Sequence, residues 1–461
     1  MSASRNIYKD DIDFTALALQ SPEFAKYLKS NGQLDFTDPD AVRWALNATK
    51  DTLNTLKPRA NEHRQLTKSL LQRDFGLKVN IPDKRLCPPV PNRLNYILWL
   101  QDLLDTTGDK YQGRYDADRK VVGLDIGTGC CSIYPLLGCS MRPGWSFFAT
   151  DIDEGNIESS RANVIANGLD SRITVVRTNS EEKLIPLDTK LKVDRLDFTM
   201  CNPPFYASQD EMVASAEAKD RPPFSACTGA EVEMVTAGGE VAFISRMIEE
   251  SLQLRNKVLW YTSMCGKLSS ISVLIEKLIE HGNNNYAVTE FVQGNKTKRW
   301  ALAWSWTDIR PTAAVARGIT TIPKHLLPFP SEYTFTATTE SIDEVATTVD
   351  AELGALSLQW LWRKSLATGV GFAMQNVWSR QARRKLRNPD AMADQPRVEE
   401  SKAALGFGVQ LKKEFSDDKG VKVIIRWIKG TDTVLFESFC GMLKRKIDSK
   451  PRFESQTPIP Q

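Results

Sequence analysis

The chain has 461 residues, which is more than one compact domain usually holds. Hydrophobic residues make up 41% of the chain and charged residues 25%, so the composition predicts a globular protein and argues against disordered, collagen-like and membrane classes. Lys and Arg number 60 and Asp and Glu number 57, for a formal net charge of +3. This balance excludes a histone-like polycation, so any nucleic-acid site has to be a local basic patch.

Histidine and cysteine are poorly placed for a metal site or a nucleophilic triad. The three histidines, His63, His281 and His325, are far apart in sequence, and the eight cysteines include no CxxC pair. A zinc site and a Ser-His-Asp triad are therefore not expected. The N-terminus has no basic-then-apolar signal region, and no apolar run approaches the length of a membrane span. We expect a reduced intracellular protein that uses neither a metal nor a membrane.

Short apolar runs alternate with helical patterns from Lys120 onward. VVGLDIG, SFFATDI, RITVVRT, LDFTMCN and KVLWYTSM have the composition of strands that are buried on both faces. Strands that alternate with helices predict a parallel sheet with right-handed crossovers, so we expect an α/β domain over residues 86–308. Residues 1–85 are polar with helical patterns and are predicted to form an N-terminal helical extension.

The C-terminal part of the chain has a different composition. Residues 309–330 are rich in Pro, Thr and Ala and are predicted to be a linker. Residues 331–447 mix strand-like and helical runs, which predicts a second, α+β domain, and residues 448–461 are predicted to be a flexible tail. The segment FAMQNVWSRQARRKLRN is predicted to be one helix with five cations and no acid. A solvated helix face is the ordinary explanation, but the lack of acids favours a surface that contacts phosphates.

The first chemical motif is a strand that runs into glycines, Leu124 to Gly129 (LDIGTG). Glycines at the end of a strand allow the backbone to approach a ligand at the carboxyl edge of a sheet, although a GxG alone is often only a tight turn. Ser132 stands where a GxGxxG motif has its third glycine, which argues against a dinucleotide cradle. Asp151 ends the next strand, where an acid can accept both hydroxyls of a ribose. Together these features predict a cofactor with an adenosyl group.

The second motif is Asn202-Pro203-Pro204-Phe205, directly after the strand-like LDFTMC. Two prolines remove two backbone N–H groups and fix φ, so the turn is stiff and presents bare carbonyls beside the Asn202 side-chain oxygen. Two such acceptors can hold both hydrogens of an exocyclic amine while Phe205 stacks on the ring that bears it. The motif predicts methyl transfer to an aromatic or amide nitrogen, with a proline-rich turn at a sheet edge as the alternative.

Longer segments extend these motifs: RDFGLKVNIPDKRL, VPNRLNYILW, DIGTGCCSIYPLLGC, CNPPFY, RPPFSACTGA, GGEVAFISRMIEESLQL and RWALAWSW. Over about residues 1–308 the chain strongly resembles the methyltransferase-like protein 16 family. Its members transfer a methyl group from S-adenosylmethionine to adenine N6 in structured RNA, notably U6 spliceosomal RNA, and are related to bacterial enzymes that methylate large-subunit ribosomal RNA. The resemblance implies a Rossmann-like class I methyltransferase sheet. An apparent insertion around residues 45–65 has no assigned role.

The resemblance assigns roles residue by residue. Arg93 is expected to bind the carboxylate end of the cofactor through two hydrogen bonds, with an ordinary helix-start cation as the alternative. The expected cofactor-binding set is Arg93, Asp125, Gly127, Gly129, Cys131, Asp151 and Asn202, and the expected catalytic set is Asn202, Pro203, Pro204 and Phe205. Cys131 stands where the family often has Ser, which puts a hydroxyl contact in doubt, and Asp151 stands where it often has Glu.

The same resemblance implies RNA contacts. Tyr206 is expected to stack on a base, with a core position as an equal alternative. The basic residues expected to contact RNA are Arg5 and Lys9 in the N-terminal tail, Lys219 and Arg221 after the NPPF turn, Lys296, Lys298 and Arg299 at a strand-connecting loop, Lys267 in the segment SMCGKL, and Arg383, Arg384, Lys385 and Arg387 in the second domain. Each alone is an ordinary surface cation, but as a group around one pocket they favour phosphate positioning.

We therefore predict an S-adenosyl-L-methionine-dependent RNA adenine-N6 methyltransferase with a C-terminal RNA-binding domain. The resemblance implies a structured RNA hairpin as partner, U6 small nuclear RNA above all, and a nuclear location, with the cytoplasm as a second one. We expect a monomer or a weak dimer. Two alternatives stay open. In the first, the chain is an RNA-binding or splicing factor whose methylation activity is secondary. In the second, it uses the NPPF turn to methylate ribosomal RNA, DNA adenine or protein glutamine.

Overall fold

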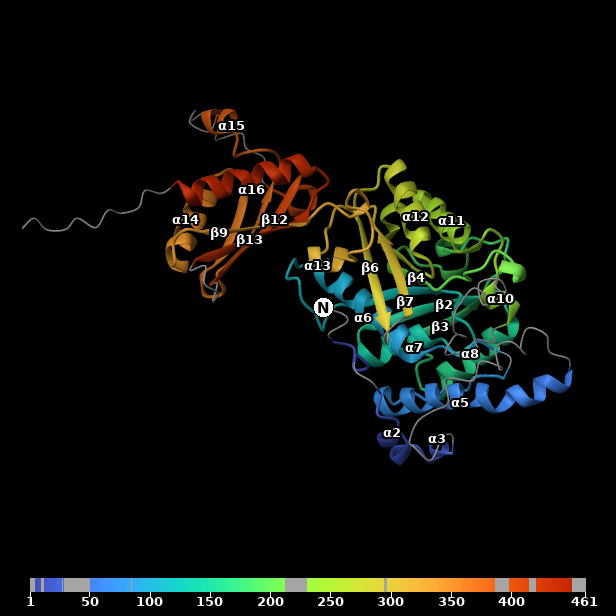
Figure 1. The fold of residues 1–461 in the computed structure, drawn as a ribbon. Coiled ribbons are helices and arrows are strands. Elements are labelled where there is room, and N and C mark those ends of the chain that lie inside the picture. Colours follow the sequence, from blue (N-terminus) through green and yellow to red (C-terminus); the bar gives the residue numbers. More distant parts are fainter. Residues whose placement is uncertain are drawn as a thin grey trace, which may run out of the picture. The chain divides into compact units, whose positions relative to one another are not determined.

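The computed structural model describes residues 5–9, 12–26, 28, 50–83, 85–211, 230–293, 297–385, 398–413 and 420–449. The chain divides into two compact units, each with its own sheet and its own hydrophobic core (Figure 1). The first unit contains Met1–Asp105, Arg114–Thr307 and Ala314–Pro328, and the second contains Thr106–Gly113, Asp308–Ala313 and Phe329–Gln461.

The first unit is built on an eight-stranded sheet with the order β3-β2-β1-β4-β5-β7-β6-β8. The strands from β3 to β5 in this order run parallel, whereas β7 runs antiparallel to β5 and β6. The strands are β1 (Val121–Ile126), β2 (Trp145–Asp151), β3 (Ile173–Arg177), β4 (Leu196–Cys201), β5 (Val258–Cys265), β6 (Tyr286–Gln293), β7 (Thr297–Trp304) and β8 (Arg317–Gly318). The predicted α/β, Rossmann-like sheet is confirmed, and its switch point lies between β1 and β4.

Helices cover both faces of this sheet (Figure 1). One core contains buried side chains of α5, α6 and α7, and a second contains those of α11 and α12. The helices of this unit are α2 (Phe14–Gln20), α3 (Pro22–Ala25), α5 (Lys50–Phe75), α6 (Val90–Thr106), α7 (Ile133–Met141), α8 (Glu154–Ala166), α10 (Glu231–Met234), α11 (Gly239–Leu254) and α12 (Leu268–Glu280), with α13 (Ala313–Ala316) at its boundary. Helix α5 ends before Gly76, whose φ of 67° is that of a glycine C-cap.

Most of the segment expected to be a linker, Ala314–Pro328, is packed into the first unit. Strand β8 pairs in parallel with β6, and the indole N–H of Trp99 donates a hydrogen bond to the Val315 carbonyl at 3.1 Å. Ile319, Ile322 and Leu326 are buried in the core formed with α11 and α12. Composition was therefore misleading for Ala314–Pro328: the buried apolar side chains among its Pro and Thr residues hold the segment in place.

The second unit is a five-stranded antiparallel sheet with the order β10-β11-β12-β13-β9. Two helices share its core, in which the Trp427 and Phe436 rings are stacked with centroids 5.2 Å apart. The elements are β9 (Glu332–Ala337), α14 (Ile342–Gly354), β10 (Gln359–Arg363), β11 (Thr368–Ala373), α15 (Arg380–Lys385), β12 (Leu405–Lys413), β13 (Val421–Lys429) and α16 (Thr433–Asp448). The predicted second, α+β region is confirmed.

Two segments that lie outside residues 331–447 complete the second unit. Thr106–Gly113 comes from the connection between α6 and β1, and its Tyr111 ring lies 5.0 Å from the Phe372 ring. Asp308–Ala313 follows β7, and the Asp308 carboxylate forms an ion pair with Lys429 at 2.5 Å. Sequence patterns identified neither segment, because each is too short to carry a periodicity.

The long basic helix predicted for the second domain is wrong. Phe372 and Ala373 belong to β11, and α15 begins only at Arg380. Between them the chain turns, with the Ser379 N–H donating to the Asn376 side chain at 3.0 Å. Short polar side chains that bind the backbone in this way compete with helix formation.

Among the described helices, none is both long and apolar enough to cross a membrane.

Candidate active site

The loop after β1 is pinned to the end of β2. The N–H groups of Gly127 and Thr128 both donate to the Thr150 carbonyl at 2.9 Å. Gly127 and Gly129 have φ values of 71° and 66°, which other residues rarely adopt. A Cβ at either position would meet no protein atom within 4 Å, so the backbone conformation is what requires glycine here. The loop thus exposes its backbone at the switch point of the sheet, where α/β folds bind their ligands.

Asp151 closes this loop from the end of β2. One carboxylate oxygen accepts the Gly129 N–H at 2.9 Å, and the other accepts the Asp153 N–H at 3.0 Å and the Asn156 amide at 3.4 Å. Burial raises the pKa of Asp151, and these hydrogen bonds oppose the rise. Since a carboxylate has about four acceptor positions, Asp151 can orient the loop and still accept a ribose hydroxyl.

Asp125 is a buried acid near the end of β1. It is fully buried, and neither carboxylate oxygen has a hydrogen-bond partner in the described part of the chain. Burial raises its pKa to about 7; the nearby Thr128 hydroxyl lowers it, and the Asp151 charge raises it further. A buried carboxylate without a partner is unfavourable, so this position favours a ligand with a cationic donor. The α-ammonium of S-adenosylmethionine is such a donor.

Arg93 is the complementary group, on the first turn of α6. It is 8% exposed, with its Nη1 3.8 Å from the Met264 sulfur and its Cζ 5.6 Å from the centre of the Tyr134 ring. No acidic side chain among the described residues forms an ion pair with it. A guanidinium surrounded by a thioether and an aromatic ring retains its donors for a carboxylate. Arg93 and Asp125 therefore suit the two charged ends of an amino-acid group.

The NPPF turn follows β4, the strand next to β1. Asp125 lies opposite Met200 in the β1–β4 pairing, so Asn202 is close to it at the same edge of the sheet. The Asn202 side-chain oxygen is buried and has no partner within the described residues. Such an acceptor is available to an amine, and the bare Pro203 carbonyl lies next to it in the chain.

Backbone hydrogen bonds and a tight glycine contact fix the aromatic residues of this turn. Tyr206 forms an isolated parallel bridge with Val235, and its N–H donates to the Met234 carbonyl at 3.2 Å. Phe205 lies against Gly266, where a Cβ would be 2.8 Å from the ring atom Cδ1. The Arg299 guanidinium carbon lies 5.5 Å from the centre of the Phe205 ring. The structure thus places Arg299, an expected RNA contact, over the Phe205 ring, which is expected to stack on the base.

Glu240 is a site residue that the sequence reasoning missed. Its side chain is 2% exposed and accepts the N–H groups of Gly266 at 2.6 Å and Lys267 at 3.0 Å. It thereby holds the turn between β5 and α12 against Phe205. An acid in the first turn of a helix is normally explained by the helix dipole, so the sequence carried no signal of this tertiary contact.

Several cations expected to bind RNA are paired within the protein. The pairs are Lys267 with Glu211 at 2.5 Å, Lys298 with Glu290 at 3.0 Å, and Arg5 with Asp102 at 2.5 Å. The Lys267 and Lys298 side chains are about half exposed. Exposed ion pairs contribute only about 0–1 kcal/mol, so a phosphate can replace the carboxylate. Lys9 is exposed.

The remaining predicted residues differ in how far they are described. Cys131 is 3% exposed and packs in the core with α5 and α6, where burial raises the pKa of its thiol well above the usual value. Lys219, Arg221, Lys296 and Arg387 lie outside the described residues, as do the side chains of Arg383, Arg384 and Lys385 on α15. Within the described residues there is no cluster of three or more metal-ligating side chains.

Comparison with known proteins extends the resemblance. A family model described as RNA methyltransferase matches residues 47–308. The U6 small nuclear RNA (adenine-(43)-N(6))-methyltransferase of Schizosaccharomyces pombe is 33% identical over 418 residues, which are 90% of this chain and 96% of that protein. RNA N(6)-adenosine-methyltransferase METTL16 of Homo sapiens is 40% identical over 66% of this chain, which spans about half (50%) of its length.

Solved structures agree with these sequence matches. The hMettl16 catalytic domain in complex with the MAT2A 3′UTR hairpin 1 has a TM-score of 0.54 and 37% identity, covering 66% of this chain and 95% of that one. The N-terminal domain of human METTL16 in complex with SAH has a TM-score of 0.50 and 37% identity, covering 66% and 98%. The expected family and enzyme class are confirmed: the chain belongs to the RNA methyltransferase family that includes METTL16 and the U6 small nuclear RNA enzyme of Schizosaccharomyces pombe.

Proposed function

We propose that this chain transfers a methyl group from S-adenosylmethionine to N6 of an unpaired adenine in a structured RNA. The observation that carries the proposal is the set of unpartnered buried groups at the ends of β1 and β4: the Asp125 carboxylate and the Asn202 amide oxygen. The buried Asp125 carboxylate favours a cationic hydrogen-bond donor, and the Asn202 amide oxygen favours a neutral donor. A zwitterionic methyl donor and an exocyclic amine meet both demands at one edge of the sheet.

The residues of the chain act mainly by positioning. Arg93 and Asp125 bind the carboxylate and ammonium of the cofactor, and Asp151 accepts its ribose hydroxyls. The Asn202 oxygen and the Pro203 carbonyl accept the two amine hydrogens, which turns the nitrogen lone pair toward the cofactor, while Phe205 stacks on the base. The bound cofactor supplies an electrophilic methyl group on its sulfonium. The new N–C bond would form as the C–S bond breaks, with the neutral thioether S-adenosylhomocysteine as the leaving group, and the methylated nitrogen would release one proton to water.

The RNA substrate we propose is a hairpin of the U6 small nuclear RNA type, which places the protein in the nucleus. The names of its relatives support this choice, since a U6 enzyme matches 90% of this chain over 96% of its own length and the solved neighbours include hairpin complexes. A flipped, unpaired adenine also fits a pocket that reads the base through its amine and its flat face. The RNA contacts we propose are those of Arg299, which lies over the Phe205 ring, of Lys267, which follows the Gly266 turn against that ring, and of Lys298 on β7.

The second unit supports RNA binding through its sheet. Strand alternation places Val409, Val423 and Trp427 toward the helices, so Arg363, Lys412 and Lys422 lie on the opposite face of the sheet. Cations on such a face suit contacts to the RNA backbone, which position a hairpin without reading its sequence. We propose that residues 331–447 raise the affinity for RNA in this way.

The test is methyl transfer by the full chain from labelled S-adenosylmethionine to U6-type hairpins with and without the unpaired adenine. We expect transfer only when the adenine is present. Asn202→Ala removes the amine acceptor and should lower the transfer rate by about 10²-fold or more. Hairpin binding without transfer would instead favour an RNA-binding factor. Transfer to DNA adenine or to a glutamine peptide, but not to the hairpin, would contradict the substrate.

A further inference from the structure

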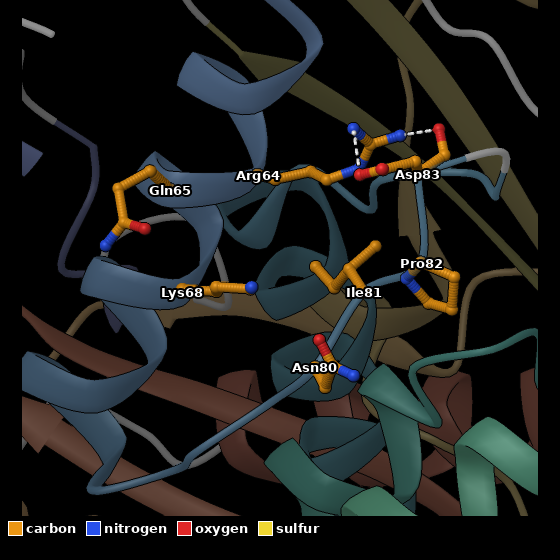
Figure 2. A pocket seen from close by; sticks show the side chains of 7 residues that line it. All are labelled: Arg64, Gln65, Lys68, Asn80, Ile81, Pro82 and Asp83. Atoms are coloured by element: carbon orange, nitrogen blue, oxygen red, sulfur yellow. Dashed lines mark hydrogen bonds and ion pairs between the residues drawn. The ribbon is translucent and has the colours of Figure 1, made fainter. Parts of the chain in front are cut away.

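A polar pocket of about 360 Å³ lies between α5 and the extended segment that follows it (Figure 2). Helix α5 contributes Arg64, Gln65 and Lys68, and the segment contributes residues 80–83. None of these residues belongs to the candidate active site. The pocket is therefore a feature of the N-terminal part of the first unit that methyl transfer does not explain.

Hydrogen bonds outside the pocket hold both of its walls. The Asn80 N–H donates to the Asn163 side chain at 2.7 Å, and the Asn80 carbonyl accepts from the same side chain at 2.9 Å. On the other wall, the Thr67 hydroxyl of α5 donates to the Pro88 carbonyl at 3.2 Å. Since both backbones are fixed in this way, the pocket is formed before a ligand arrives, and binding costs little ordering of the chain.

The charge inside the pocket is positive. The Arg64 guanidinium donates to the Asp83 carbonyl, and its Nη1 lies 3.4 Å from the Asp83 carboxylate. The Arg64 side chain is 7% exposed, whereas that of Asp83 is 85% exposed. Because Asp83 is so exposed, water screens its carboxylate and weakens the attraction between that carboxylate and the guanidinium. The pocket is open to solvent at the Asp83 end.

Lys68 adds a second cation. Its side chain extends from α5 toward the opposite wall, between Arg64 and Asn80 (Figure 2). The part of the chain that the structure describes offers its ammonium no ion pair or hydrogen bond. An ammonium that faces a polar pocket with three free donors favours an anionic ligand.

We propose that this pocket binds a phosphate group, with Lys68 and Arg64 as its cationic contacts and the Asn80 side-chain amide as a neutral donor. Donors from both walls match oxygens that point in several directions, as those of a phosphate do. The volume exceeds that of a bare ion and accommodates an attached sugar, whose hydroxyl the exposed Asp83 carboxylate can accept. A backbone phosphate of the RNA substrate fits best, and in that form the proposal rests on the proposed function. A free phosphate shares the same chemistry.

The experiment compares the full chain with Lys68→Gln, Lys68→Arg and Lys78→Gln, without cofactor. Lys78 is an exposed cation on the same segment that does not line the pocket, so its variant loses the same charge nearby. Hairpin affinity is measured over a range of salt concentrations, and binding of inorganic phosphate is followed separately by phosphorus NMR. For Lys68→Gln we expect the slope of log affinity against log salt to fall by about one, with Lys68→Arg near the wild type and Lys78→Gln changed less.

The outcomes separate the sources of the phosphate. If Lys68→Gln changes only the RNA slope, the ligand is the RNA backbone. If it abolishes binding of inorganic phosphate but leaves the RNA slope unchanged, the pocket holds a free phosphate. Equal effects of Lys68→Gln and Lys78→Gln, or no effect in either arm, would overturn the proposal. Because none of these measurements involves methyl transfer, a failure of the proposed function would appear separately, as binding without transfer.

Discussion

Gly266 lies so close to Phe205 that a Cβ at position 266 would be 2.8 Å from the ring atom Cδ1. Glu240 holds this turn in place by accepting two backbone N–H groups, at 2.6 and 3.0 Å. On the same ring, Arg299 lies 5.5 Å from the centroid. The aromatic residue of the NPPF turn is therefore positioned by residues of α11, of β7 and of the turn after β5, far from it in sequence.

Gly266→Ala is expected to lower the rate of methyl transfer by about 10²-fold, because displacing a positioning group by about 1 Å has an effect of that order. Affinity for the cofactor should be unchanged, since Arg93, Asp125 and Asp151 are untouched. Single-turnover kinetics with saturating cofactor measure the effect. Gly354→Ala is the control, because a Cβ there meets no atom within 4 Å. An unchanged rate for Gly266→Ala would show that Phe205 does not need this contact.

Glu240→Gln should lower the free energy of unfolding by about 2 kcal/mol, because it weakens hydrogen bonds from two N–H groups to a buried charge. The transfer rate should fall as well, with little change in cofactor affinity. Urea unfolding and single-turnover kinetics check both expectations. Glu249→Gln is the matched control on α11, since that side chain is 62% exposed and pairs with Lys277 at the surface. Equal effects of the two variants would argue against a positioning role for Glu240.

Asp125→Asn should change how stability depends on pH. Burial raises the pKa of Asp125 to about 7, so the folded chain keeps a proton that the unfolded chain loses from about pH 4 upward. The free energy of unfolding of the wild type therefore falls as pH rises through this range, by about 4 kcal/mol at most. The variant cannot ionise there and should become the more stable protein by pH 8. Urea unfolding without cofactor at pH 5 and pH 8 measures the difference, and parallel pH curves would contradict the expectation.

Arg93→Lys should weaken S-adenosylmethionine binding by about tenfold or more, because a single ammonium cannot form the two parallel hydrogen bonds of a guanidinium. The sharpest measurement adds decarboxylated S-adenosylmethionine, which lacks the group that Arg93 is proposed to bind. Wild type and variant should bind this analogue with similar affinity. A loss of affinity that is equal for both ligands would place Arg93 elsewhere in the site.

The sequence predicts the sheet and the position of the two chemical motifs at its edge, because each is a local pattern. A buried strand is a run of apolar residues, and Gly127, Asp151 and Asn202 each follow or end such a run. The parallel order of the strands follows from the alternation with helices, so residues at strand ends could be placed at one edge before the structure was known.

The sequence does not predict the contacts between elements that are far apart in the chain. The contact of Glu240 with Gly266 joins two helix-start regions that no local pattern connects. The pairing of Lys267 with Glu211 and of Lys298 with Glu290 is likewise set by the fold, so a count of cations overstated the free positive charge. The basic helix was mistaken because periodicity alone cannot distinguish the end of β11 from the start of a helix.

The path of Thr106–Gly113 has a consequence for protein engineering. This segment leaves the first unit after α6, which carries Arg93, completes the second unit, and returns to β1, which carries Asp125. A protein cut after β7 would leave Tyr111 without the Phe372 ring that it contacts. The second unit is therefore not a separable C-terminal domain. Exchanging one continuous C-terminal segment would leave both units incomplete. The exchange would also disturb the connection between α6 and β1, the two elements that carry the expected charged contacts to the cofactor.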